Sequence, residues 1–166
     1  MKVGLSLGSN VGDRLAHLQS AKQYLLSRAS DPRSQWSPIY ETAPVHCPPG
    51  SAAFLNAVVE INFTGSPRGL LQNVLAYEAA HGRDRSAGPN APRTIDIDIL
   101  YFGETVVADS DLQIPHPRLA ERRFVLVPLA AICPDRVVVG TGQSVRALLQ
   151  ELPDQSGAVK FVQQDW

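Results

Sequence analysis

The chain has 166 residues, a mass of 18.0 kDa, a formal net charge of −1 at pH 7, and 44% apolar against 19% charged residues. We expect one domain spanning residues 1–166, since this length can bury its own core, and the charge argues against a protein that coats nucleic acid. The longest apolar run, residues 124–133, is too short to cross a bilayer, and the two cysteines make no C-x-x-C pair, so we expect a cytoplasmic protein with no membrane partner.

The N-terminal half is predicted to alternate strands with one helix. Turn-forming prolines and glycines interrupt its apolar patterns and set the boundaries between elements. In chain order the pattern predicts a strand at residues 3–7, a helix from about Asp13, a strand at 34–41, a loop at 43–52 and a strand at 54–63.

A second helix carries the strongest local signals. Ser66 is suited to cap it, Pro67 to its first turn and Gly82 to its end. Its apolar stripe includes Val74, and the next position in line with that stripe is Glu78. Two interpretations stay open for Glu78: a partly exposed residue at the edge of the stripe, or an anchor for the following loop or a ligand.

The C-terminal half begins with a polar loop at 83–92, of a length typical of lids and binding segments, followed by a strand at 93–100. After a turn near Gly103, residues 114–117 lead into a helix from about Arg122. The order strand, helix, strand, strand, helix, strand predicts an α+β fold. Specifically, we expect a ferredoxin-like split βαβ sandwich, with a mainly antiparallel sheet, helices on one face and a C-terminal extension.

The strand at 93–100 carries the most informative pattern of the chain. Its isoleucines alternate with polar residues, so Asp96 and Asp98 should share one face with Cα atoms about 6.5–7 Å apart. Two such carboxylates repel unless a cation joins them, and hard oxygen ligands suit Mg²⁺, which leaves further positions for water and phosphate. The pattern therefore predicts a nucleotide-phosphate site. The alternative is an ordinary solvated strand face.

The arginines strengthen the phosphate interpretation. Twelve of the fifteen basic residues are arginines, and six of these lie between residues 83 and 123. Arginine binds phosphate bidentately. The chain has no P-loop, no G-x-G-x-x-G, no G-x-S-x-G and no H-E-x-x-H, while His46 beside Cys47 is weak evidence for a covalent nucleophile. Paired acids, arginines and His116 are sufficient for phosphoryl-type transfer, which depends mainly on positioning and electrostatics.

Taken together, these motifs resemble those of the 6-hydroxymethyl-7,8-dihydropterin pyrophosphokinases of folate biosynthesis. The matching segments occur in the family's order from residue 4 to about residue 130: Leu7 to Asn10, Tyr40 to Pro44, Phe54 to Ala57, Glu78 with Gly82 to Arg85, Pro92 to Leu100, and Pro115 to Arg118 with Arg122, Phe124 and Pro128-Leu129. The resemblance implies transfer of a diphosphate from ATP, the co-substrate, to the hydroxymethyl group of the pterin, with release of AMP.

The resemblance also implies a set of site residues. Asp96 and Asp98 would bind two Mg²⁺ ions, and with Arg85 and Arg93 they would form the catalytic group. The implied ATP contacts are Glu78, Arg83, Arg85, Arg93, Ile99, His116 and Arg122. The implied pterin contacts are Gly8, Asn10, Thr42, Ala43, Pro44, Val45, Phe54, Asn56 and Phe124, with the two phenylalanines stacking on the flat ring. From the residues alone, core packing is the alternative for both phenylalanines.

Two rival functions remain open, and the chain departs from its relatives at one place. An RNA-binding module would need stacking aromatics on its central strands, and a non-catalytic nucleotide sensor would not need the Asp96/Asp98 pair. Many relatives carry Arg-Trp-Gly where this chain has Pro89-Asn90-Ala91, so its loop lacks one arginine and one aromatic. We expect small-molecule substrates, no nucleic-acid partner, a monomer, and a functional link to other enzymes of the folate pathway.

Overall fold

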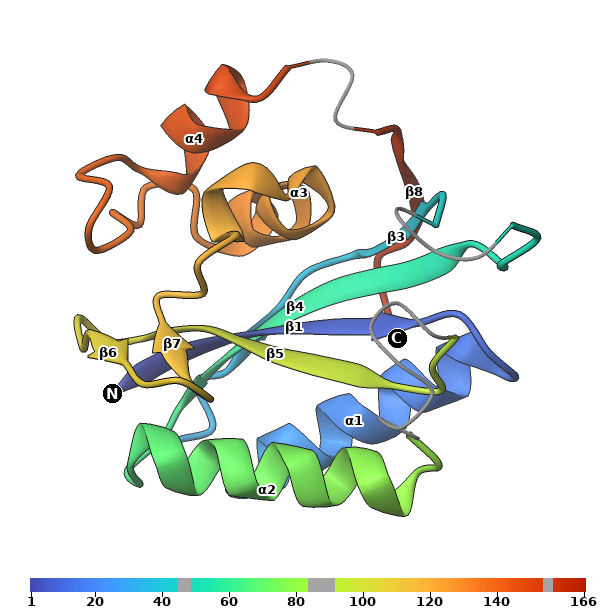
Figure 1. The fold of residues 1–166 in the computed structure, drawn as a ribbon, viewed down its shortest axis with the longest axis horizontal. Coiled ribbons are helices and arrows are strands. Elements are labelled where there is room, and N and C mark those ends of the chain that lie inside the picture. The colour runs from blue at the N-terminus through green and yellow to red at the C-terminus, as the bar shows by residue number, and fades with distance from the viewer. Residues whose placement is uncertain (45–48, 84–91, 154–156) are drawn as a thin grey trace.

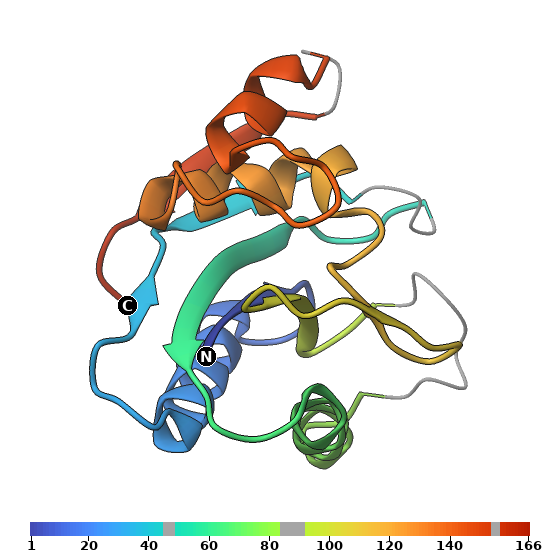
Figure 2. The same cartoon turned by 90° about the vertical axis from the view of Figure 1, so that its left-hand side faces the viewer.

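A computed structural model describes residues 1–44, 49–83, 92–153 and 157–166. An antiparallel sheet forms its middle layer, with α1 and α2 on one face and α3 on the other, and α4 lies outside α3, as Figures 1 and 2 show from two sides. The elements are β1 (Lys2–Ser9), α1 (Arg14–Arg28), β2 (Gln35–Trp36), β3 (Ile39–Thr42), β4 (Phe54–Asn62), α2 (Pro67–Ala80), β5 (Asp96–Phe102), β6 (Val107–Ala108), β7 (Gln113–Ile114), a 3₁₀ turn (Leu119–Glu121), α3 (Arg123–Ile132), α4 (Val145–Glu151) and β8 (Val159–Gln163).

The strands of the main sheet run in the order β5-β1-β4-β3-β8, with β2 also paired to β4 and every pairing antiparallel. The order places β5 at one edge, beside β1. The C-terminal extension supplies the opposite edge through β8, and its Trp166 ring lies 4.3 Å from Lys22 Nζ on α1. A separate hairpin, β6–β7, follows β5.

The predicted helix starts are confirmed. Asp13 accepts a hydrogen bond from Ala16 N at the start of α1, and Ser66 accepts one from Gly69 N at the start of α2, with Pro67 in the first turn. The strand predicted at 34–41 is in fact two strands. Pro38 has no backbone N–H to donate. Ser37 N–H still donates to Val58 O at 2.9 Å, but Val58 N–H donates to the Ser37 side-chain hydroxyl and not to a backbone carbonyl.

Placing the helices on one face was wrong. α1 and α2 cover one face of the sheet, whereas α3 covers the other face and α4 packs on the outer side of α3 (Figure 1). The reason lies in β4, which is buried on both sides: Ala57 and Val59 pack toward α1 and α2, whereas Val58 packs toward α3 and α4. A central strand that is apolar on both faces needs cover on both.

A buried polar cluster ties α3 to the sheet. Glu60, 3% exposed, accepts hydrogen bonds from Lys2 Nζ at 2.8 Å, from the Tyr101 hydroxyl at 2.6 Å and from Arg136 Nη2 at 3.0 Å. Burial acts to raise the pKa of Glu60, but these hydrogen bonds and the charge of Arg136 outweigh burial and leave that pKa below its ordinary value. The ionised carboxylate therefore contributes stability at neutral pH that is lost in acid.

Gly4 has no side chain, and this leaves room for the Tyr101 ring of the cluster. Replacing Gly4 tests whether that ring can move. A Cβ at Gly4 would lie 2.3 Å from Tyr101 Cε1, whereas a Cβ at Gly8, on the same strand, would meet nothing closer than 3.7 Å. Because the Tyr101 ring is held by its bond to Glu60, Gly4→Ala should cost about 1–3 kcal/mol in the free energy of unfolding. Gly8→Ala is the control and should stay close to wild type in urea denaturation. Equal losses in the two variants would show that the Tyr101 ring can move aside.

Candidate active site

The strand β5 presents its two acidic residues on the face of the sheet covered by α3. Ile95, Ile97 and Ile99 are 1%, 4% and 5% exposed and belong to the core on the α1 and α2 side. The alternation of a strand turns Asp96 and Asp98 to the other face, as the sequence predicted. The same alternation turns the Ile99 side chain into the core, away from the aspartates, and its predicted contact with ATP stays a prediction.

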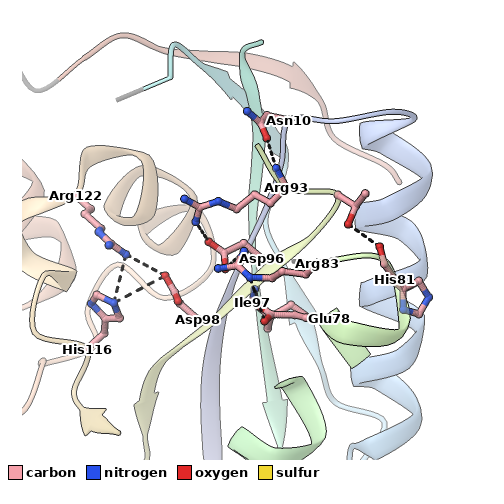
Figure 3. Close-up of polar contacts among 11 residues, drawn as sticks. Asn10, Glu78, His81, Arg83, Arg93, Asp96, Ile97, Asp98, His116 and Arg122 are labelled. Atoms are coloured by element: carbon pink, nitrogen blue, oxygen red, sulfur yellow. Dashed lines mark hydrogen bonds and ion pairs between the residues drawn. The ribbon is translucent and has the colours of Figure 1, made fainter. Parts of the chain in front are cut away.

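Each aspartate is paired with cationic side chains from other segments (Figure 3). Asp96 forms ion pairs with Arg93 and with Arg83, whose Nη1 lies 2.6 Å from Asp96 Oδ1. Asp98 Oδ2 accepts a hydrogen bond from Arg122 Nη1 at 3.0 Å. Arg83 therefore has carboxylate partners within the protein itself. Arg85, the remaining predicted arginine, lies outside the described residues.

His116 lies beside Asp98, with Nε2 3.8 Å from Asp98 Oδ2. Its backbone N–H donates to Leu100 O at 2.8 Å, and its Nδ1 accepts from Arg118 N at 3.0 Å. Burial is the main cause that lowers the pKa of His116 below its ordinary value, against the raising effect of Asp98, and this favours the neutral ring.

The placement of His116 depends on a feature that the sequence did not predict. The register between β1 and β5 shifts between Gly4 and Leu5, which leaves Leu100 unpaired with β1. The extra residue turns its carbonyl toward His116. Nothing in the apolar pattern marks this bulge, because Leu100 is as buried as its neighbours.

One row of directly paired residues crosses four strands of the sheet, and this row ends at Asp96. Gly8 on β1 pairs with Asp96 on one side and with Asn56 of β4 on the other, and Asn56 pairs with Tyr40 of β3. Directly opposed residues of antiparallel strands share a face. A Cβ at Gly8 would lie 3.7 Å from Asn56 Oδ1 and 3.8 Å from Phe54 Cδ1, so the missing side chain leaves room between the acids and β4.

The predicted pterin contacts gather around this row, with one exception. Asn56 is 4% exposed and donates through Nδ2 to Thr42 Oγ1 at 2.8 Å, and the Arg93 guanidinium lies 5.8 Å from the centre of the Phe54 ring. Phe124, in the first turn of α3, has the Arg122 guanidinium 5.6 Å from its ring centre. Ala43 and Pro44 follow directly after Thr42, whereas Val45 lies outside the described residues.

Asn10 is the exception. It is 3% exposed, and its side chain holds two segments of backbone: Oδ1 accepts from Arg93 N at 2.8 Å, and Nδ2 donates to Ala52 O at 3.4 Å. Its own backbone N–H donates to Arg93 O at 3.1 Å. In this structure Asn10 therefore fixes the approach to β5 instead of presenting its amide to a ligand.

Glu78 is buried in this structure, and its predicted contact with ATP stays a prediction. Its carboxylate is 1% exposed, and Oε1 accepts a hydrogen bond from Ile97 N at 2.7 Å. Its Oε2 lies 3.5 Å from Arg83 Nε. The sequence left open whether Glu78 is a partly exposed edge residue or an anchor. In the structure Glu78 is buried and anchors β5 and Arg83.

The donor set suits a hard cation. Among the described residues no three His, Cys, Asp or Glu side chains converge as a complete metal cage, so Asp96 and Asp98 stand as a carboxylate pair. A pair is what Mg²⁺ ordinarily takes from a protein when phosphate and water supply the remaining oxygens. The Asp98 side chain is 37% exposed, so an incoming ligand can reach it. The arrangement can thus bind a metal–phosphate group at the edge of the sheet.

Comparison with known proteins gives one family. The family model described as "7,8-dihydro-6-hydroxymethylpterin-pyrophosphokinase (HPPK)" matches residues 4–134. The chain is 43% identical over 157 residues to a 2-amino-4-hydroxy-6-hydroxymethyldihydropteridine pyrophosphokinase of Methylorubrum extorquens, covering 92% of this chain and 94% of that protein. It is 43% identical over 129 residues to the protein of the same name from Bacillus subtilis, covering 78% and 76%.

A solved structure agrees in fold. The crystal structure of Plasmodium falciparum HPPK-DHPS, wild type with pteroate, matches with a TM-score of 0.67 and 15% identity over 90% of this chain and 42% of that one. At this identity the match supports the fold alone. In the part of the chain that the structure describes, no helix has the length and apolar character needed to span a membrane.

The role of Asn10 as a backbone clamp can be tested without any ligand. Asn10→Ala leaves Arg93 N–H without its acceptor in a buried place, which should cost about 1–3 kcal/mol in the free energy of unfolding. Asn10→Asp keeps an acceptor for Arg93 N–H and should lose less. The measurement is urea denaturation of the three proteins. A fully stable alanine variant would show that the clamp contributes nothing.

Proposed function

The chain belongs to the 7,8-dihydro-6-hydroxymethylpterin-pyrophosphokinase family, and on that premise we propose that it transfers the diphosphate of ATP to the hydroxymethyl oxygen of 6-hydroxymethyl-7,8-dihydropterin and releases AMP, as a step of folate biosynthesis. The observation that carries the proposal for this chain is the Asp96/Asp98 pair, which lies among three arginines and next to the row through Gly8 and Asn56. A phosphate site and a site for a flat polar ring therefore adjoin.

The charges of the site support binding of a metal–triphosphate group. Among the described residues of the site, Arg83, Arg93 and Arg122 are matched in formal charge by the carboxylates of Asp96, Asp98 and Glu78. A triphosphate that arrives with Mg²⁺ brings both an anion for the arginines and a cation for the aspartates. Arg93 and Arg122 can then exchange their aspartate partners for phosphate oxygens while Asp96 and Asp98 turn to the metal, and Arg83 keeps the carboxylate of Glu78 as its partner.

Asp96 and Asp98 would hold the metal, for which we propose two Mg²⁺ ions. When bound, Mg²⁺ supplies charge neutralisation and alignment of the phosphate oxygens. Arg93 and Arg122, each close to one aspartate, are placed to hold phosphate oxygens bidentately. The neutral ring of His116 adds a contact beside Asp98. Arg85 stays a prediction from the sequence.

The pterin would lie over the row of Gly8 and Asn56, between Phe54 and Phe124. Asn56 Nδ2 donates to Thr42, and Oδ1 lies toward Gly8, which makes Oδ1 the atom we propose to accept from the amino edge of the pterin. Stacking on an aromatic face adds about 0.5–1.5 kcal/mol beyond the buried area. Backbone groups from Ala43 onward, and Val45 with them, complete the set predicted from the sequence.

We also propose a more specific fold class, an oligomeric state, a cellular location and a functional link for this chain. The strand order β5-β1-β4-β3, with α1 and α2 as crossovers, supports a ferredoxin-like split βαβ unit to which α3, α4 and β8 are added. We further propose a monomer in the cytoplasm. The Plasmodium structure is that of an HPPK-DHPS protein, which supports a functional link between this chain and a further folate enzyme.

The primary test is release of AMP. The wild-type chain should release AMP from ATP only when both Mg²⁺ and the reduced pterin are present. Asp98→Asn, which cannot replace a charged metal ligand, should lower turnover about a hundredfold or more. Asp111→Asn is the matched control. Asp111 lies in the turn between β6 and β7 and forms an exposed ion pair with Arg68 of α2. Turnover of Asp98→Asn within about threefold of wild type, with the fold intact, would refute the metal assignment.

Replacing Phe124 should distinguish binding of the pterin from binding of ATP. Phe124→Ala should weaken binding of the pterin about tenfold or more, because stacking and apolar contact with the ring are lost together, and should leave ATP affinity nearly unchanged. Titration calorimetry with each ligand gives both constants. Phe161→Ala, which removes an aromatic ring that is 56% exposed on β8, serves as the control. Equal weakening of both ligands, or unchanged pterin affinity, would return Phe124 to core packing.

A further inference from the structure

Glu78 is a fully buried carboxylate that comes from the α2 layer and reaches the edge of the sheet at β5 (Figure 3). We infer that Glu78 is a positioning residue for the metal site: it fixes the backbone between Asp96 and Asp98, and it remains the counter-ion of Arg83 when Asp96 turns to a metal-bound triphosphate. This inference rests on the proposed function and assigns Glu78 a role other than direct contact with ATP.

The edge position of β5 gives Glu78 its backbone role. An edge strand presents N–H groups that have no strand partner. Ile97 lies opposite Leu7 of β1, but its N–H points outward and is bound by Glu78 Oε1 at 2.7 Å. Because Ile97 separates the two aspartates, fixing its peptide group fixes the direction in which both carboxylates leave the strand.

The contacts of Arg83 give Glu78 its counter-ion role. The Arg83 side chain is 15% exposed and has two carboxylates nearby, Glu78 Oε2 at 3.5 Å from Nε and Asp96 Oδ1 at 2.6 Å from Nη1. Both are ion pairs without hydrogen-bond alignment, since neither Nε nor Nη1 has a hydrogen-bond partner among the described residues. The backbone N–H of Arg83 also donates to Glu78 O at 3.1 Å. Arg83 is thus held to Glu78 through backbone and side chain, and to Asp96 through its side chain alone.

This asymmetry bears on metal binding. If Asp96 leaves Arg83 for a cation, Arg83 would be a buried charge without an anion, which is costly, unless Glu78 stays in place. With Glu78 present, Asp96 can be released at little cost. With a neutral residue at position 78, Arg83 would hold Asp96 and compete with the metal for its carboxylate. Partners of metal ligands commonly change metal affinity about 10- to 100-fold when they are replaced.

The test compares two buried glutamates of the same protein. Glu78→Gln keeps the shape and an oxygen that can accept from Ile97 N–H, but loses the charge next to Arg83. Glu60→Gln is the control, because Glu60 is 3% exposed, also bound to an arginine, and lies at the other end of the site face. Metal affinity is measured by titration of Mn²⁺ in the presence of a non-hydrolysable ATP analogue, and pterin affinity by calorimetry without nucleotide.

We expect Glu78→Gln to weaken Mn²⁺ binding about tenfold or more and to leave pterin affinity unchanged within about twofold. Glu60→Gln should lower the melting temperature and leave Mn²⁺ binding as in the wild type. A Glu78→Gln variant that loses thermal stability but binds Mn²⁺ like the wild type would overturn the counter-ion role.

The backbone role has a readout in the protein without ligands. Glu78→Ala should speed amide hydrogen exchange of Ile97 at least about tenfold, because the outward N–H loses its only described acceptor, while Glu78→Gln should retain most of the protection. Unchanged exchange in Glu78→Ala would overturn the backbone role. If the wild type released no AMP with pterin and ATP, the proposed function would fail, whereas the exchange result would still decide what Glu78 does to β5.

Discussion

The balance of charge between three arginines and three carboxylates is the interaction on which the site depends. Arg83, Arg93 and Arg122 approach the edge strand from three different segments, and each meets an acid of β5 or α2. None of these groups could be half buried without an opposite charge nearby. A ligand that carries both signs of charge can exchange partners with them, and this explains why the same side chains can hold the site together before substrate arrives and bind it afterwards.

The second constraint is that the sheet is covered on both faces. One face, with α1 and α2, is apolar and forms the larger core, and it holds the isoleucines of β5 in place. The other face is divided. Near α3 and α4 it is a smaller core closed by the Glu60 cluster, and toward the ends of β1 and β4 it carries the polar row of Asp96, Gly8 and Asn56. The segment that follows α3 is anchored there through Arg136, and the first turn of α3, at the other end of the helix, carries Phe124.

Backbone clamps set the precision of the site. Asn10 ties the end of β1 to residue 93, Glu78 binds the outward N–H of β5, and the bulge at Leu100 holds His116. Each clamp uses a buried polar atom that would be costly to leave unpaired, so each also contributes to stability. Their common effect is that the aspartates project from a strand whose free edge is fixed, as a site of defined geometry requires.

The sequence by itself determined the alternation of β5, the caps of α1 and α2, the order of the elements and the residue types of the site, because these depend on local periodicity and on backbone chemistry. Tertiary structure alone decided that helices cover both faces and that Arg83 pairs with Asp96. It also decided that the side chains of Asn10 and Glu78 bind backbone N–H groups and that Leu100 presents its carbonyl to His116. These outcomes depend on which segments meet across the sheet, and the side chains concerned carry no periodic signal of that meeting. A buried glutamate and a substrate-binding glutamate look the same in a sequence; the packing around them makes the difference.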